Sequence, residues 1–193
     1  MKGYKIVQWN DAVSKVCNSR DNPLYKEAGL HWSRPTIWAK EDSEPRFDTE
    51  KPFLYSLVRN HGKSLTKDHI VYIGLTTAPR SRFGNHETAH EIVKKNGQVK
   101  FSYAPVDFIS GKNRIERIGK ALEEIEHLLI WAVRSKDMCN ERKCFTLPGM
   151  GKNGGNAWHI FNTGYRFCGR MPREIVFPWM IAKLGRDRTA KPR

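Results

Sequence analysis

The chain has 193 residues, 39% of them hydrophobic and 28% charged, which indicates one domain with enough apolar material for a core. Its 34 Lys and Arg against 20 Asp and Glu leave a net charge of +14, which favours polyanions: nucleic acid first, an anionic membrane surface second. No apolar run approaches the roughly 18 residues of a membrane span, and we expect no secretory signal, because the N-terminus lacks its hydrophobic region. Four cysteines are too few for a disulfide scaffold, so we expect a cytoplasmic protein.

Residues 1–50 form an N-terminal extension rich in aromatic and basic side chains. We expect a short strand at 5–9, a short helix at 10–17 and a linker at 41–45. Trp32, Arg34 and Trp38 place aromatic and cationic groups close together, so we regard them as candidates for contact with DNA.

Residues 51–142 carry the clearest secondary-structure signals. Strands at 53–59 and 69–75 flank a polar, basic loop and predict a hairpin. Pro79 suits the first turn of a helix at 79–95, and a strand at 98–109 precedes a long amphipathic helix at 114–134. This order predicts an α+β fold: a small antiparallel or mixed sheet of about three core strands, flanked by helices.

Residues 143–193 form a C-terminal extension that is first Gly-rich and then aromatic and basic. Residues 177–184 suit a short docking helix, and 186–193 suit a loose tail. Lys152 in the Gly-rich loop is a further candidate for contact with DNA, as are Lys63 and Lys67 in the hairpin loop. The core and both extensions are expected to form one compact domain.

Two tyrosines stand on the predicted hairpin, Tyr55 on its first strand and Tyr72 on its second. A strand tyrosine usually packs the sheet surface, but a phenol also transfers protons once its pKa of about 10 is lowered or a neighbour takes the proton. The register, which the sequence leaves open, decides whether both rings share one face. Gly74 leaves room for close backbone approach or marks a bulge.

Arg82, His86 and His90 follow at intervals of four residues, which would place them on one face of the helix at 79–95. On an arbitrary helix such a stripe is usually a solvated surface. Here it begins just after Tyr72, so Arg82 can neutralise a phosphate and His86 can hydrogen-bond a phenol or shuttle its proton. For His90 we expect contact with DNA or with solvent.

Glu126 lies at the border of the apolar stripe on the helix at 114–134, where a carboxylate can face a space between helix and sheet. The alternative is an ordinary glutamate at the rim. A single carboxylate completed by water and substrate oxygens suits Mg²⁺, which keeps most of its hydration shell. Asn140 follows near the end of the same helix; alone, an asparagine in a loop indicates turn chemistry.

In their order along the chain, these residues resemble the active-site motifs of the GIY-YIG endonuclease superfamily: Tyr55, Tyr72-Ile73-Gly74, Arg82, His86, Glu126 and Asn140. In that superfamily two tyrosine motifs lie on neighbouring strands, an Arg-x-x-x-His element follows on a helix, and a glutamate and an asparagine come later. The first motif departs, because Phe53-Leu54-Tyr55 stands where Gly-Ile-Tyr is usual. The resemblance covers residues 52–142.

The resemblance implies a DNA endonuclease in which water attacks a phosphodiester in line. Tyr55 would act as general base, with Tyr72 or His86 accepting or positioning its proton. Arg82 would stabilise the pentavalent phosphate, and Glu126 would hold one Mg²⁺ or Mn²⁺ per active site. We expect a stand-alone restriction-type or phage-related enzyme; cutting both strands of double-stranded DNA favours a homodimer.

Other interpretations stay open. The altered first motif motivates a non-catalytic nucleic-acid-binding module on a degenerate GIY-YIG scaffold, and the aromatic, basic N-terminus motivates RNA binding. The G-x-G-x-x-G pattern at 149–154 lacks the following helix and acidic residue of a nucleotide site, so we set that function aside. We also set aside a zinc site, because paired Cys-x-x-Cys spacing is missing among Cys139, Cys144, Cys168 and His159.

Overall fold

The computed structural model describes residues 13, 17, 20–21, 23–60, 68–95, 97–108, 115–134, 137–149 and 155–178. The strand expected at 5–9, the hairpin loop at 61–67 and the tail at 186–193 lie outside these residues. Most of the helices expected at 10–17 and 177–184 lie outside them as well.

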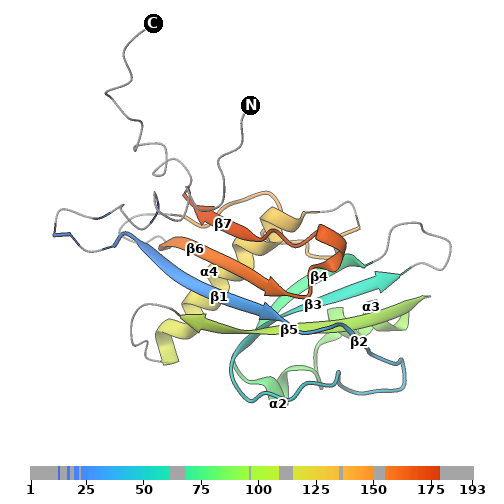
Figure 1. Ribbon diagram of the computed structural model, residues 1–193. Helices are drawn as coiled ribbons and strands as arrows, with labels where there is room; N and C mark the ends of the chain where they lie inside the picture. The colour runs from blue at the N-terminus through green and yellow to red at the C-terminus, as the bar shows by residue number, and fades with distance from the viewer. Residues whose placement is uncertain are drawn as a thin grey trace, which may run out of the picture.

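One mixed sheet dominates the described residues and curls into a half-barrel (Figure 1). Its strands run in the order β4-β3-β5-β1-β6-β7, and β2 pairs with β5 outside this path. All neighbouring pairs are antiparallel except β1 and β6, which are parallel. The strands are β1 (Tyr25–Trp32), β2 (Thr36–Ile37), β3 (Phe53–Asn60), β4 (His69–Thr76), β5 (Gln98–Phe108), β6 (Ala157–Gly164) and β7 (Glu174–Phe177).

Helices cover both faces of the sheet. The long α4 (Ile115–Val133) packs on one face, where Leu122, Ile125 and Leu129 join a core with Ile73 and Ile160. The short α2 (Pro79–Arg82) and α3 (Glu87–Lys94) lie on the opposite face, over β4, β3 and β5 (Figure 1). Within the described ranges, no helix is both long and apolar enough to cross a bilayer.

The expected hairpin is confirmed. β3 and β4 pair antiparallel, with Tyr55 opposite Gly74 and Leu57 opposite Tyr72. The register then shifts between Leu57 and Val58, a β-bulge in the hairpin. The strand expected at 98–109 and the helix expected at 114–134 are present as β5 and α4. These elements are built mainly from local patterns, which explains why the sequence predicted them.

The predicted fold class is wrong. Instead of a small sheet of about three strands flanked by helices, the protein has a seven-stranded mixed sheet with three α-helices in its described part. The additional strands come from the two extensions, because β1 pairs with β6 along its whole length and β7 pairs with β6. β1 contains Lys, Glu, Ala and Gly, residues with weak strand preference, and its partners lie far away in the chain.

The single helix expected at 79–95 is also wrong. Two short helices, α2 and α3, are separated by Phe83, Gly84, Asn85 and His86. Gly and Asn are poor helix formers, and His86 has a non-helical backbone because it caps α3. Arg82, His86 and His90 therefore do not share one helical face, and the bend between the helices sets their orientations.

Candidate active site

Tyr55 and Tyr72 extend from the same face of the hairpin, near the β4 edge of the sheet. Tyr55 stands opposite Gly74, two residues beyond Tyr72, and the two phenol rings are 6.1 Å apart between centroids. A Cβ built on Gly74 would lie 2.9 Å from Cε1 of Tyr55 and still closer to its Cζ and Oη. The glycine therefore leaves the space that the Tyr55 ring fills. Tyr55 is fully buried, whereas Tyr72 is partly exposed.

His86 makes the closest polar contact of the Tyr55 hydroxyl, with 2.5 Å between Oη and Nε2. The Nδ1 atom of the same ring accepts a hydrogen bond from the backbone N–H of Ala89 at 3.4 Å. This cap implies that the ring proton sits on Nε2, which then donates to the Tyr55 oxygen. One guanidinium nitrogen of Arg82 lies 3.4 Å from Nε2. An imidazole and a guanidinium thus converge at one phenol.

Burial controls the titration of these groups. It raises the pKa of Tyr55 well above its usual value, with a further increase from Tyr72 and a decrease from Arg82. Burial and then the Glu126 carboxylate raise the pKa of Tyr72, while Arg82 and a hydrogen bond with Tyr55 lower it. Burial, Arg82 and His90 lower the pKa of His86 to about 4. At neutral pH both phenols are protonated and His86 is uncharged.

Glu126 reaches this group of side chains from α4. Its carboxylate raises the pKa of both tyrosines, so it lies within electrostatic range of them. Lys143 donates a hydrogen bond from Nζ to Oε2 of Glu126 at 2.5 Å. Burial raises the pKa of Glu126, and the Lys143 and Arg82 cations oppose that increase. Sequence reasoning missed Lys143, because no motif separates it from the other lysines of the chain.

The single carboxylate of this site, Glu126, fits a hard divalent ion that is held mostly by water and substrate oxygens. The described residues contain no group of three or more His, Cys, Asp or Glu side chains that could hold a metal. Glu126 would therefore be the single protein carboxylate, an arrangement that Mg²⁺ accepts when substrate phosphate completes its shell. The Lys143 ammonium sits beside the carboxylate that such an ion needs, so the two cations would compete for it.

Asn140 binds backbone rather than the other side chains predicted to be catalytic. Its Nδ2 donates to the carbonyl of Ile73 at 2.8 Å, and its Oδ1 accepts from the N–H of Ile73 at 3.0 Å. The N–H of Cys139 also donates to the carbonyl of Val71 at 2.6 Å. Residues 139–140 thus cover the edge of β4 like a short additional strand and hold the Tyr72-Ile73-Gly74 motif in place.

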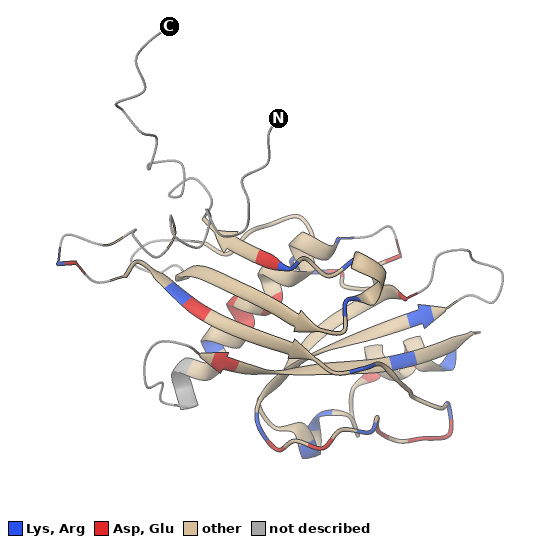
Figure 2. Ribbon diagram, in the orientation of Figure 1, with Lys and Arg blue, Asp and Glu red and all other residues tan. Residues whose placement is uncertain are grey.

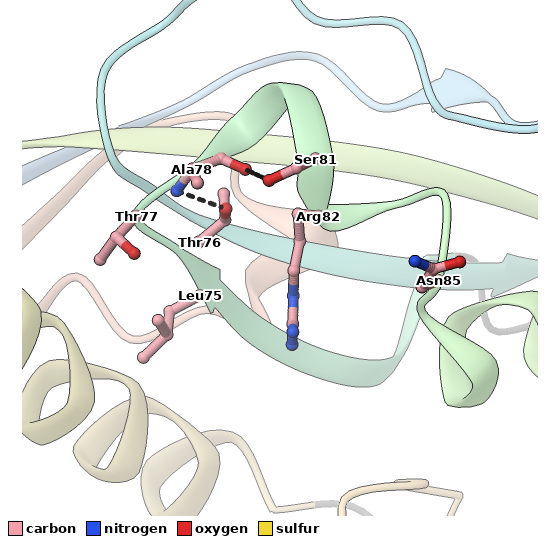
Figure 3. A pocket seen from close by; sticks show the side chains of 7 residues that line it. All are labelled: Leu75, Thr76, Thr77, Ala78, Ser81, Arg82 and Asn85. Carbon is pink, nitrogen blue, oxygen red and sulfur yellow. Dashed lines mark hydrogen bonds between the residues drawn. The ribbon is translucent and has the colours of Figure 1, made fainter.

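A surface hollow lies at the end of β4 and includes Arg82 of the site in its lining (Figure 3). Its lining combines a guanidinium, hydroxyls and an amide from β4, α2 and the turn that follows: Leu75, Thr76, Thr77, Ala78, Ser81, Arg82 and Asn85. Arg82 extends across the opening (Figure 3). Such donors suit the oxygens of a phosphate group.

Most residues predicted to contact DNA lie elsewhere. Trp32 and Trp38 are buried, with their indole N–H groups bonded to Asn162 Oδ1 and to the carbonyl of Asp42. The Nε2 atom of His90 bonds the carbonyl of Phe83 at 2.7 Å, and its ring packs against Trp38. Arg34 is exposed. Lys63, Lys67 and Lys152 lie outside the described residues.

The positive charge is unevenly distributed along the chain. The described residues carry a net charge of only +2 out of +14, and Figure 2 shows basic and acidic residues interspersed among them. The remaining +12 belongs to segments outside the described residues. Long-range attraction of a polyanion would therefore come mainly from those segments.

The four residues considered for zinc do not converge in the structure. Cys144 donates to the carbonyl of Asn140 and Cys168 to the carboxylate of Asp68, while Cys139 lies on the β4 edge. His159 is buried on β6, with Nε2 bonded to Glu174 and Nδ1 3.8 Å from Glu27. Of the G-x-G-x-x-G pattern, only Gly149 lies within the described residues.

Comparisons with protein-family models, with curated proteins and with solved structures gave no match to this chain.

Proposed function

We propose that this protein is a divalent-metal-dependent endonuclease of the GIY-YIG type that hydrolyses phosphodiester bonds of DNA. One observation carries the proposal. Five groups interact at one edge of the sheet: two phenols from the hairpin, a guanidinium from α2, a neutral imidazole from the α3 cap and a partly buried carboxylate from α4. Packing alone does not require this combination of proton-transfer, phosphate-binding and metal-binding groups.

In this mechanism the scissile phosphate lies beside Arg82, whose guanidinium neutralises the additional negative charge of the pentavalent transition state. Glu126 is the residue that would hold a divalent ion, and such an ion would supply Lewis-acid stabilisation of the phosphate and the leaving oxygen.

The proton of the attacking water passes to a phenolate, so one phenol must first release its own proton to solvent. Tyr72 is the better candidate for this contact, because it is partly exposed while Tyr55 is fully buried. Tyr55 hydrogen-bonds Tyr72 and lowers its pKa, and His86 and Arg82 in turn stabilise negative charge on Tyr55. In this arrangement Tyr55 and His86 form a buried chain of hydrogen bonds behind the Tyr72 phenolate: His86 donates to Tyr55, and Tyr55 donates to Tyr72. This is a change from the role expected for Tyr55 as the direct base.

The direct test is cleavage of supercoiled plasmid DNA by the purified protein with Mg²⁺ or Mn²⁺, with EDTA as the control. We expect nicked and linear products, and a loss of at least about 100-fold in rate for Glu126→Ala and for Arg82→Ala. The nuclease proposal fails if no plasmid, duplex or single-stranded DNA is cut. Sedimentation with a duplex oligonucleotide would test the homodimer expected of a restriction-type enzyme.

A non-catalytic nucleic-acid-binding module is the second candidate. It is favoured by the Lys143–Glu126 ion pair, which neutralises the proposed metal ligand, and by the complete burial of Tyr55. In that case the protein would bind DNA, and Glu126→Ala would leave the affinity unchanged.

A further inference from the structure

Phe145 is 77% exposed, more than any other large hydrophobic side chain in the described ranges. The segment that carries it is fastened to two consecutive residues of α4. Lys143 bonds Glu126, and Thr146 bonds Nε2 of His127 through its carbonyl at 2.7 Å and its hydroxyl at 3.1 Å. Phe145 therefore belongs to the segment that contacts Glu126, the proposed metal ligand, and follows by two residues the lysine that makes this contact.

A cation covers part of the Phe145 ring. The Cζ atom of Arg134 lies 4.5 Å from the ring centroid, and the backbone N–H of Arg134 continues the hydrogen-bond pattern of α4 by donating to Ile130. Trp131, three residues earlier on α4, is 46% exposed. The surface next to the site is thus aromatic and cationic together, rather than purely apolar.

This chemistry matches a nucleic-acid base with its neighbouring phosphate. An exposed aromatic ring stacks on any base, and an adjacent guanidinium adds cation–π and phosphate contacts. A purely apolar protein partner would leave the Arg134 charge without a counterpart. A base inside an intact duplex has both faces covered by its neighbours, so stacking on Phe145 requires an unpaired or extruded base.

We propose that Phe145 and Arg134 form a stacking platform for one unpaired or extruded DNA base near the proposed site of Arg82 and Glu126. The inference rests on the proposed nuclease function and adds a substrate class: DNA that is locally opened at the cutting site.

The platform can be tested by binding, without cleavage, in a Glu126→Gln background. Three fluorescein-labelled DNAs of one sequence are compared by anisotropy: a single strand, a perfect duplex and a duplex with a short central bubble. We expect Phe145→Ala to weaken binding of the bubble duplex about tenfold and that of the perfect duplex much less, and Phe145→Trp to retain binding. Ile37→Ala, an exposed hydrophobic residue on β2, is the matched control and should change neither affinity.

A second readout is 2-aminopurine placed in the bubble, whose fluorescence should fall on binding to the Phe145-containing protein but not to Phe145→Ala. Unchanged affinities, or equal losses on all three DNAs, would overturn the platform. Unchanged DNA binding with a dimer that dissociates in Phe145→Ala would assign the surface to a second copy of the chain. Plasmid cleavage by the wild type is measured separately. Selective binding of the bubble duplex without cleavage would reject the nuclease proposal and leave the stacking platform supported.

Discussion

The Tyr55 ring lies over Gly74, its direct partner on the neighbouring antiparallel strand. A side chain on the glycine would overlap the phenol, so the two positions are sterically coupled. This pair explains how the hairpin can position Tyr55 although Phe53 replaces the glycine usual in the first motif. Phe53 is fully buried and packs among aromatic rings, and the glycine that matters to the phenol is on the other strand.

Gly74→Ala should therefore destabilise the protein by about 1–3 kcal/mol, because the added methyl group displaces the Tyr55 ring. Chemical denaturation measures the change in the free energy of unfolding. Gly29→Ala is the matched strand control, since a Cβ there would meet its nearest neighbour, the carbonyl of Asp107, at 3.8 Å. Equal stability of the two variants would show that the Tyr55 ring does not occupy the space over Gly74.

The two phenols should differ in their effect on cleavage. Tyr72→Phe should lower kcat by roughly 10²–10⁴, the usual range for losing a general base, and leave stability nearly unchanged. Tyr55→Phe should lower kcat less but cost about 1–3 kcal/mol of stability, since it leaves Nε2 of His86 unpaired in a buried position. Single-turnover cleavage and thermal unfolding measure both effects. A larger kcat loss for Tyr55→Phe at unchanged stability would return the role of base to Tyr55.

Lys143→Gln should tighten Mn²⁺ binding about fivefold, because it removes the cation that competes for Glu126. Calorimetric titration or Mn²⁺ electron paramagnetic resonance measures the affinity independently of cleavage. Lys143→Arg keeps the charge and should bind Mn²⁺ like the wild type, while Glu126→Gln should abolish binding at this site. Weaker binding by Lys143→Gln would mean that the lysine supports the metal site.

Asn140→Ala should cost about 1–3 kcal/mol of stability, since the N–H and carbonyl of Ile73 lose their partners. Asn140→Asp keeps only the acceptor and places a charge beside the Ile73 carbonyl, so we expect a similar loss. Hydrogen exchange at the Ile73 amide reports the contact directly. Full protection of that amide in Asn140→Ala, with reduced cleavage, would indicate a chemical role for the amide.

His86 should make stability depend on pH between 6.5 and about 4. The unfolded chain takes up a proton near pH 6.5, while burial, Arg82 and His90 keep the folded imidazole neutral down to about pH 4. The contribution is present above pH 6.5 and is lost as the pH falls through this window. His86→Asn retains a good N-cap residue, so its stability should depend less on pH in this window. Tm measured from pH 4 to 7.5 for the variant and the wild type gives the two slopes. Identical slopes would contradict a depressed pKa.

The elements that the sequence predicted depend on patterns among neighbouring residues, whereas the elements that it missed depend on partners far away in the chain. The β3–β4 hairpin, β5 and α4 are visible as alternation or helical periodicity within a few residues. β1 and β6 are stabilised by each other across more than 120 residues, and β1 has little strand preference of its own. The break between α2 and α3 depends on the His86 cap, which competed with a periodicity favouring one helix.

By itself the sequence determined the identity and order of the reactive groups, because each stands in a local pattern: Tyr55 and Tyr72 in strands, Arg82 and His86 at a fixed spacing, Glu126 at the border of an apolar stripe. Only the tertiary structure decided their roles. Strand register placed Tyr55 over Gly74, burial separated the hidden phenol from the accessible one, and chain reversal after α4 brought Lys143 to Glu126 and Asn140 to Ile73. These contacts join residues far apart in the chain, and pairing between such residues leaves no periodic trace in the sequence.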